Sequence, residues 1–268
     1  MKLLKIIIYT QWSVLYSLVI LLFLISCTAP FTSTAPPTPQ AVTVSITPSL
    51  TYLIKQLHHC ASSHPEVALY QYETPAPFFD LNNIDFAIQL GEPIRNQSNG
   101  TFVSNNRPQY IARIGWEQIV IIVNKANSVS ILSDNTLSGL FSGQITNWDG
   151  LGNRTGPVHI YISPEDDDVR HAIESTILQG KPFTTQASIA ANPLAMLKVI
   201  SSDQSAIGYF PQSWFVDASS TPTMDTHVPV LSKELMEELK QPVIVLSHNE
   251  PQGAARSLLL CLQSSMIR

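Results

Sequence analysis

Four consecutive acidic residues, Glu165, Asp166, Asp167 and Asp168, form the densest group of ionisable side chains in this sequence. Carboxylates gathered in this way can bind a divalent metal, a cationic ligand or a hydroxylated one, although the run lacks the glycine-spaced pattern of a calcium loop. The same residues also fit the first turn of a helix, where acidic side chains stabilise the helix dipole while they face solvent. From the sequence, both interpretations stay open.

No other group of residues indicates catalysis or metal binding. No serine is surrounded by the glycines of a nucleophile elbow, so a hydrolase is not indicated. His58 and His59 are adjacent and would point to different faces of a helix, and no further ligand cluster accompanies them. His159 lies in an apolar strand pattern, where we expect a packed histidine rather than a base. We therefore predict a protein that is not an enzyme and has no metal site and no cofactor.

Strand and helix patterns alternate along the chain. Short apolar runs rich in β-branched residues predict strands, and apolar residues three and four positions apart predict helices. This alternation is typical of an α/β fold with mostly parallel sheets. The predicted strands are residues 42–46, 67–72, 84–89, 119–124, 158–162, 206–210 and 243–247, and the predicted helices are residues 50–60, 137–141, 168–178, 194–200 and 253–264.

The N-terminus has the pattern of an export signal. Lys2 and Lys5 precede an apolar run that begins at Val14 and closes at Ser26 and Cys27. A small residue followed by cysteine resembles the lipobox of bacterial lipoproteins. The resemblance implies removal of residues 1–26 and a diacylglyceryl group on Cys27, and two acyl chains anchor a protein durably. The alternative is a signal anchor that stays as a transmembrane helix. In either case the rest of the chain is expected on the extracytoplasmic side of the cell membrane.

The composition indicates a folded, mildly acidic exported domain. Residues 27–42 are rich in Pro, Thr, Ser and Ala and predict an extended tether. Charged residues are 13% and hydrophobic residues 44% of the chain, a composition too apolar for disorder. The 268 residues, less the leader and the tether, are enough for one large or two small domains. The formal charge of −5 would become −7 without the two leader lysines, so nucleic acid is not an expected partner.

Cys60 and Cys261 remain once Cys27 is assigned to lipidation. An even number of cysteines in an oxidising compartment favours a disulfide between them. Each lies in a predicted helix, one near the start and one near the end of the folded region. The alternative is a pair of buried free thiols.

Several segments resemble the phosphate-type extracytoplasmic solute-binding proteins. They are the strand and turn of residues 121–129, the helix and loop of residues 137–148 that end in Ile-Thr-Asn-Trp, the Ala-Ile-Gly-Tyr-Phe stretch of residues 206–210 and the closing run of residues 242–246. The resemblance extends from about Val42 to the C-terminus. It implies two α/β lobes joined by crossing strands, with a ligand cleft between them. Lobe 1 would comprise residues 43–120 and 209–268, and lobe 2 residues 121–208. Asn147 and Trp148 are expected to be structural.

By the same resemblance, three loops supply the ligand cleft. The first contains Thr47 and Ser49, the second contains Glu73 and Thr74, and the third runs from Ser163 to Arg170. The candidate cleft residues are therefore Thr47, Ser49, Glu73, Thr74, Ser163, Asp166, Asp167 and Asp168.

The third loop departs from the phosphate-type pattern. The family carries Arg-x-x-Gly-Ser-Gly-Thr there, whereas this chain has Ser163 at the arginine position and Asp166, Asp167 and Asp168 in place of Gly-Ser-Gly. Leu90 also stands where the family has a cleft aspartate. Because like charges repel a bound anion, tight phosphate binding is not expected. Arg170 and Glu174 lie four residues apart on one helix face and are expected to pair with each other.

The predicted function is an extracytoplasmic, lipid-anchored solute-binding protein of an ABC-type importer. Its partners would be an unknown small-molecule ligand and the permease subunits, and closure of the cleft around the ligand would be the working step. The alternative is a surface sensor or interaction module with the same fold and a degenerate cleft.

Overall fold

The computed structural model describes residues 38–93, 107–152, 154–217 and 225–266. Residues 39–268 form one compact unit, separate from residues 1–38, and the following description concerns that unit. The predicted leader, the lipidation site at Cys27 and most of the tether lie outside the described residues. Across the described ranges, every helix is too short or too polar to cross a bilayer.

Strands and helices alternate through the described part of the chain, as the sequence predicts. The strands are β1 (Gln40–Ile46), β2 (Val67–Glu73), β3 (Phe86–Leu90), β4 (Tyr110–Asn124), β5 (His159–Ile162), β6 (Ser188–Ile189), β7 (Ala206–Pro211), β8 (Thr226–His227) and β9 (Lys240–Ser247). The α-helices are α2 (Ile54–Ser62), α3 (Asp134–Phe141), α4 (Asp168–Ile173), α5 (Pro193–Ser202), α6 (Ser213–Asp217), α7 (Lys233–Glu238) and α8 (Gly253–Met266). Shorter helical segments are η1 (Pro48–Leu53), η2 (Ala76–Phe78) and the π-helical turn η3 (Glu174–Leu178) that continues α4.

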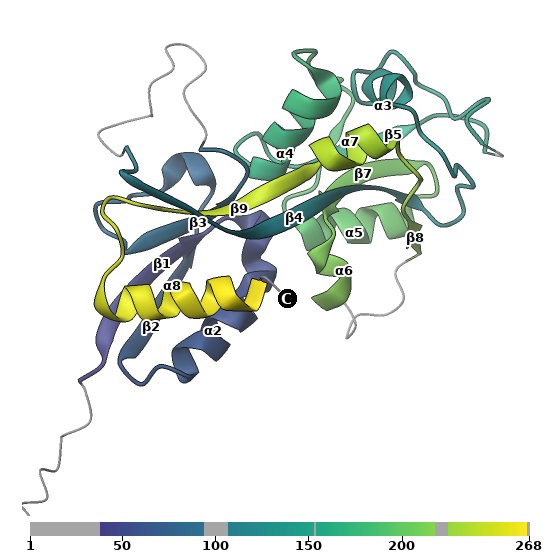
Figure 1. Ribbon diagram of the computed structural model, residues 1–268. Coiled ribbons are helices and arrows are strands. Elements are labelled where there is room, and N and C mark those ends of the chain that lie inside the picture. Colours follow the sequence, from purple (N-terminus) through teal and green to yellow (C-terminus); the bar gives the residue numbers. More distant parts are fainter. Residues whose placement is uncertain (1–37, 94–106, 153, 218–224, 267–268) are drawn as a thin grey trace, which may run out of the picture. The chain divides into compact units, whose positions relative to one another are not determined.

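The strands form a mixed sheet in the order β2-β1-β3-β9-β4-β7-β5-β6, with β8 beside β4. The sheet has two halves, which we call the first half (β1, β2, β3 and β9) and the second half (β5, β6, β7 and β8). Strand β4 belongs to both, because its residues 110–118 pair with β9 and its residues 119–123 pair with β7. Each antiparallel pairing involves β4 or β9, and the remaining pairings are parallel. Figure 1 shows β4 and β9 running beside each other through the fold. The predicted α/β fold is confirmed.

Some predicted boundaries are wrong for local reasons. The predicted helix 50–60 is divided into the 3-10 segment η1, with Pro48 at its first turn, and the α-helix α2. The predicted strand 119–124 is only the last part of β4. Its first part was missed because a bulge between Arg113 and Gly115 interrupts the alternation of buried and exposed residues. His159 is not packed as expected: its side chain is half exposed and its Nδ1 lies 2.7 Å from Asp203 Oδ2.

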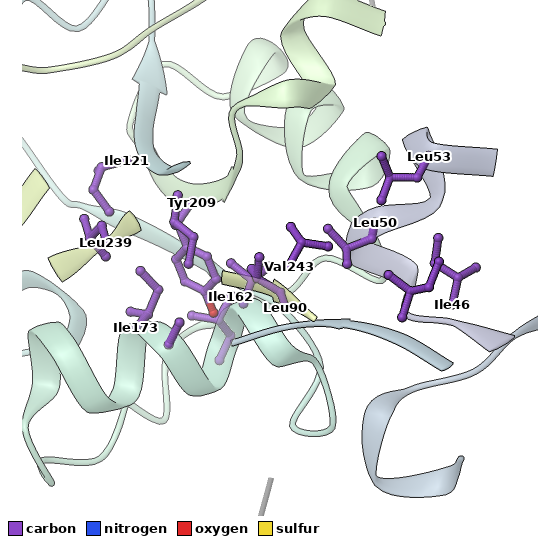
Figure 2. Close-up of a cluster of buried hydrophobic side chains, with 14 of the residues drawn as sticks. Ile46, Leu50, Leu53, Leu90, Ile121, Ile162, Ile173, Tyr209, Leu239 and Val243 are labelled. Atoms are coloured by element: carbon purple, nitrogen blue, oxygen red, sulfur yellow. The ribbon is translucent and has the colours of Figure 1, made fainter. Parts of the chain in front are cut away.

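One apolar core extends through both halves of the sheet. Figure 2 shows part of it, with side chains contributed by β1, η1 and β3 and by β4, β5, α4 and β7. The labelled members are Ile46, Leu50, Leu53, Leu90, Ile121, Ile162, Ile173, Tyr209, Leu239 and Val243. Trp148 is also buried in this core, and its indole N–H donates to the carbonyl of Ser205 at 2.9 Å, which fits the structural role expected for it.

Helices α2 and α8 lie side by side against the first half of the sheet (Figure 1). A disulfide joins Cys60 of α2 to Cys261 of α8 across a sequence separation of 201 residues. The pairing that the cysteine count favours is therefore present in the structure, and it fastens the last helix to the first α-helix of the fold.

Candidate functional site

The first site loop lies where β1 and β3 end. These strands are parallel neighbours, so their carboxyl ends lie at the same edge of the sheet. Thr47 follows β1 directly, and its N–H donates to the carbonyl of Ile88 in β3 at 3.1 Å. Thr47 and Ser49 are buried, with 1% and 0% of their surface exposed. This edge therefore presents two buried hydroxyl groups and the main-chain N–H of Leu90.

Asp168 brings its carboxylate to these groups from the start of α4. The Ser49 hydroxyl donates to Asp168 Oδ1 at 2.5 Å, and the Leu90 N–H donates to Asp168 Oδ2 at 2.8 Å. Thr47 Oγ1 lies 3.1 Å from Ser49 Oγ. One carboxylate oxygen thus accepts a hydrogen bond from η1 and the other from β3, and Asp168 is 3% exposed.

The side chain of Asp167 makes different contacts from that of Asp168. Its Oδ1 accepts hydrogen bonds from the N–H groups of Val169 and Arg170, at 3.0 Å and 3.2 Å, which is the pattern of a helix N-cap. The capping interpretation is therefore confirmed for Asp167. The expected exposure to solvent is wrong, because Asp167 and Asp168 are both buried, whereas Glu165 is exposed.

Burial makes both carboxyl groups hold a proton more firmly than a solvated aspartate. Removal from water is the main cause that raises the pKa of Asp167, and the charge of Asp168 raises it further. Removal from water also raises the pKa of Asp168, although hydrogen bonds from Ser49 and Leu90 act in the opposite direction. Arg170 does not neutralise the pair, since its guanidinium forms the predicted ion pair with Glu174 at 2.9 Å.

Further polar groups, half-buried except for the buried Glu117, surround the first loop and were not indicated by the sequence. The Trp214 indole N–H donates to the Ser49 carbonyl at 2.7 Å. The Tyr52 hydroxyl donates to Glu117, and Glu117 also accepts the N–H of Ser213 at 3.0 Å. Glu117 is 2% exposed, although it lies in a strand segment next to an exposed tryptophan. These contacts hold η1 in place beside β4 and α6.

The remaining predicted residues lie apart from the Asp168 contacts. Ser163 follows β5, where its N–H donates to the Tyr209 hydroxyl at 3.1 Å and its carbonyl accepts from Arg170 at 3.2 Å. Thr74 donates its N–H to Ile46, and Glu73 at the end of β2 is exposed. Of the eight predicted cleft residues, the structure brings together Thr47, Ser49 and Asp168, and of the eight only Asp166 and Asp168 line the adjacent cleft.

A cleft of about 1170 Å³ opens beside Asp168. One wall is formed by the ends of η2 and β3, including Phe78, Leu90 and Glu92, and the other by the loop before α4 and by α4 itself, including Glu165 and Asp166. Phe78 is 65% exposed. Carboxylates outnumber cations among the lining residues, whose basic members are His171 and Lys181. The cleft is therefore acidic.

A mixed sheet with two halves and a cleft beside the ends of their strands defines a two-lobe α/β binding-protein fold. Residues 84–254 match the PBP superfamily domain, and the chain belongs to that superfamily. No curated protein matches the sequence of the chain.

Solved structures with the same fold include transport receptors and a regulator. A protein described as a phosphate ABC transporter substrate-binding protein, with bound phosphate, from Clostridium perfringens is 14% identical, covers 83% of this chain and 93% of its own, and gives a TM-score of 0.67. An ABC-type phosphate transport receptor from Vibrio cholerae is 16% identical, with coverage of 83% and 93% and a TM-score of 0.61. The regulatory domain of Synechocystis CcmR, in complex with 2-PG, is 12% identical, with coverage of 84% and 97% and a TM-score of 0.60. At these identities the likeness shows the fold alone.

Proposed function

We propose that this chain is an extracytoplasmic solute-binding protein that is anchored to the cell membrane through lipid on Cys27 and delivers its solute to an ABC-type importer. The superfamily and the likeness to two transport receptors support the transport role. The pattern of two lysines, an apolar run and Ser26-Cys27 supports the anchor. No catalytic step enters this proposal.

We also propose that the two lobes have the boundaries predicted from the sequence, residues 43–120 with 209–268 and residues 121–208. The pairing of β4 supports the boundary near residue 120, because its partner changes from β9 to β7 between Gln118 and Ile119. The pairing of β8 with Val123 and Asn124 of β4 favours including Thr226 and His227 in lobe 2. The cleft would then lie between the lobes, where closure can enclose a solute.

The position of the Asp168 carboxylate is the observation that supports our proposal that phosphate is not bound tightly. The carboxylate accepts hydrogen bonds from the Ser49 hydroxyl and the Leu90 N–H, two groups that could otherwise donate to an oxyanion. Two unit charges about 4 Å apart repel by about 4 kcal/mol at an effective dielectric constant of about 20. That repulsion corresponds to roughly a thousandfold weaker binding. The acidic lining of the cleft acts in the same direction, so a neutral hydroxylated or cationic solute fits better.

A sensor or interaction module is the second candidate. Its support is that the Ser49 hydroxyl and the Leu90 N–H both donate to Asp168, a side chain of the same molecule, as expected for a degenerate cleft in which these donors do not serve a solute. The CcmR regulatory domain has the same fold, so the fold is not limited to transport receptors.

Native mass spectrometry of the full chain in detergent, together with a thermal-shift screen, tests the proposal. The screen contains phosphate, other oxyanions, amines, sugars and divalent metals. A co-purified small molecule, or saturable stabilisation by one class of compound, supports the solute-binding function and identifies the ligand class. A purified chain that carries nothing and responds to none of these compounds favours the sensor or interaction module.

A further inference from the structure

The Asp168 carboxylate receives the hydrogen bonds that a bound anion would receive. The Ser49 hydroxyl and the Leu90 N–H each donate to a different oxygen of the carboxylate, at 2.5 Å and 2.8 Å. The Thr47 hydroxyl, close to Ser49, also acts to lower the pKa of Asp168. Asp168 is 3% exposed, and across the described ranges no lysine or arginine forms an ion pair with it. Its partners are therefore neutral donors.

Helix capping does not account for these contacts. The cap of α4 is already formed by Asp167, which accepts the N–H groups of Val169 and Arg170. The Asp168 carboxylate is directed instead to η1 and β3. A carboxylate buried without a cation is costly, and a second carboxylate beside it adds repulsion. The hydrogen bonds from Ser49 and Leu90 offset that cost.

The donors and the carboxylate come from opposite halves of the sheet. Ser49 follows β1 and Leu90 ends β3, whereas Asp168 begins the helix that follows β5. The contacts join residues that are 119 and 78 positions apart in the sequence. A solute that contacts both lobes of a two-lobe protein stabilises the closed arrangement. A side chain that makes the same contacts acts at a high effective concentration, because it is attached to the chain.

We propose that Asp168 is an internal ligand, whose carboxylate fills an oxyanion site formed by Ser49, Thr47 and the Leu90 N–H and holds α4 against η1 and β3 in place of a solute. Free oxyanions are excluded from that site as long as the carboxylate is present. The proposal depends on the proposed function only in one respect, that a solute would bind in the cleft beside Asp168.

Asp168→Gly tests the proposal, because it removes the carboxylate and leaves the donors. We expect inorganic phosphate titrated into the full-length variant to give saturable heat, with an affinity at least tenfold higher than for the wild-type chain. Adding Ser49→Ala to Asp168→Gly should lower the affinity for phosphate at least tenfold, since a donor is lost. Asp166→Asn is the control for charge alone: it removes one negative charge from the cleft wall and leaves the Asp168 carboxylate in contact with its donors, so the gain in phosphate affinity should be smaller than with Asp168→Gly.

A folded Asp168→Gly variant that binds phosphate no better than the wild type would overturn the proposal. If that variant does not fold, hydrogen exchange in Asp168→Asn decides instead, because asparagine keeps the volume and removes the charge. The Leu90 N–H should then exchange at least tenfold faster than in the wild type, and an unchanged rate contradicts the internal ligand. Failure to find any solute in the screen would favour the sensor or interaction module over the transport function and would leave this result unaffected.

Discussion

The stability of this protein should fall as the pH rises from about 5 to about 7, because burial and the neighbouring charge of Asp168 raise the pKa of Asp167. Both folded-state pKa values are raised, that of Asp167 to about 8, above the ordinary value near 4 of an unfolded chain. The folded state therefore binds more protons than the unfolded state within this window. The stabilisation is fully present below the unfolded pKa and is lost as the pH rises through the folded pKa.

The size of the effect follows from proton linkage. One proton changes the free energy of unfolding by at most about 1.4 kcal/mol per pH unit, so two pH units give up to about 3 kcal/mol. For a chain of this length that is roughly 5–10 °C in Tm. The charged groups that face Asp167 are Asp166 and Asp168, and its other partners are the N–H groups of α4.

Thermal unfolding of the wild type and of Asp167→Asn at several pH values measures this effect. Asparagine is an equally good helix cap, so the substitution removes the titration and keeps the cap of α4. The wild type should lose more stability than Asp167→Asn over this pH range. Every other ionisable group is the same in both proteins, so its contribution cancels in the comparison. Equal pH dependence of the two proteins would refute the reasoning.

Three further outcomes are expected. Reduction of the disulfide between Cys60 and Cys261, which closes a loop of 201 residues, should lower stability by about 2–4 kcal/mol in denaturant unfolding; an unchanged midpoint contradicts this. Trp148→Phe removes the indole hydrogen bond to a buried carbonyl and should cost about 1–3 kcal/mol, whereas Trp116→Phe, at a position 48% exposed, should cost less than about 0.5 kcal/mol; equal losses contradict the structural role. Cys27→Ala should abolish a lipid mass on the purified chain and release the protein from the membrane fraction, and an unchanged mass contradicts lipidation.

The features that could be predicted from the sequence are those that local patterns determine. β-Branched runs such as residues 119–124 predict buried strands. Arg170 and Glu174 pair because the helix brings residues four apart together. Helix α7 was missed although it has a sequence signal: Ser232, whose side chain caps the helix, is followed by strong helix formers.

The central contacts of the site could not be predicted in the same way. The carboxylates of Asp167 and Asp168 are chemically alike and adjacent, yet one caps its own helix and the other reaches Ser49, 119 residues away. Only the packing of α4 against η1 and β3 distinguishes them. Glu117 is similar, because a glutamate between Trp116 and Gln118 has the pattern of an exposed strand position, and only tertiary structure buries it beside Tyr52.

Equilibrium dialysis of the full-length wild-type chain against labelled phosphate measures whether the Asp168 carboxylate keeps oxyanions out of the protein. Because the Asp168 carboxylate accepts the hydrogen bonds of the Ser49 hydroxyl and the Leu90 N–H, the protein compartment should retain no more phosphate than the buffer at any concentration up to the millimolar range. Saturable retention of one phosphate per chain at micromolar concentration would contradict the claim that this carboxylate keeps oxyanions out.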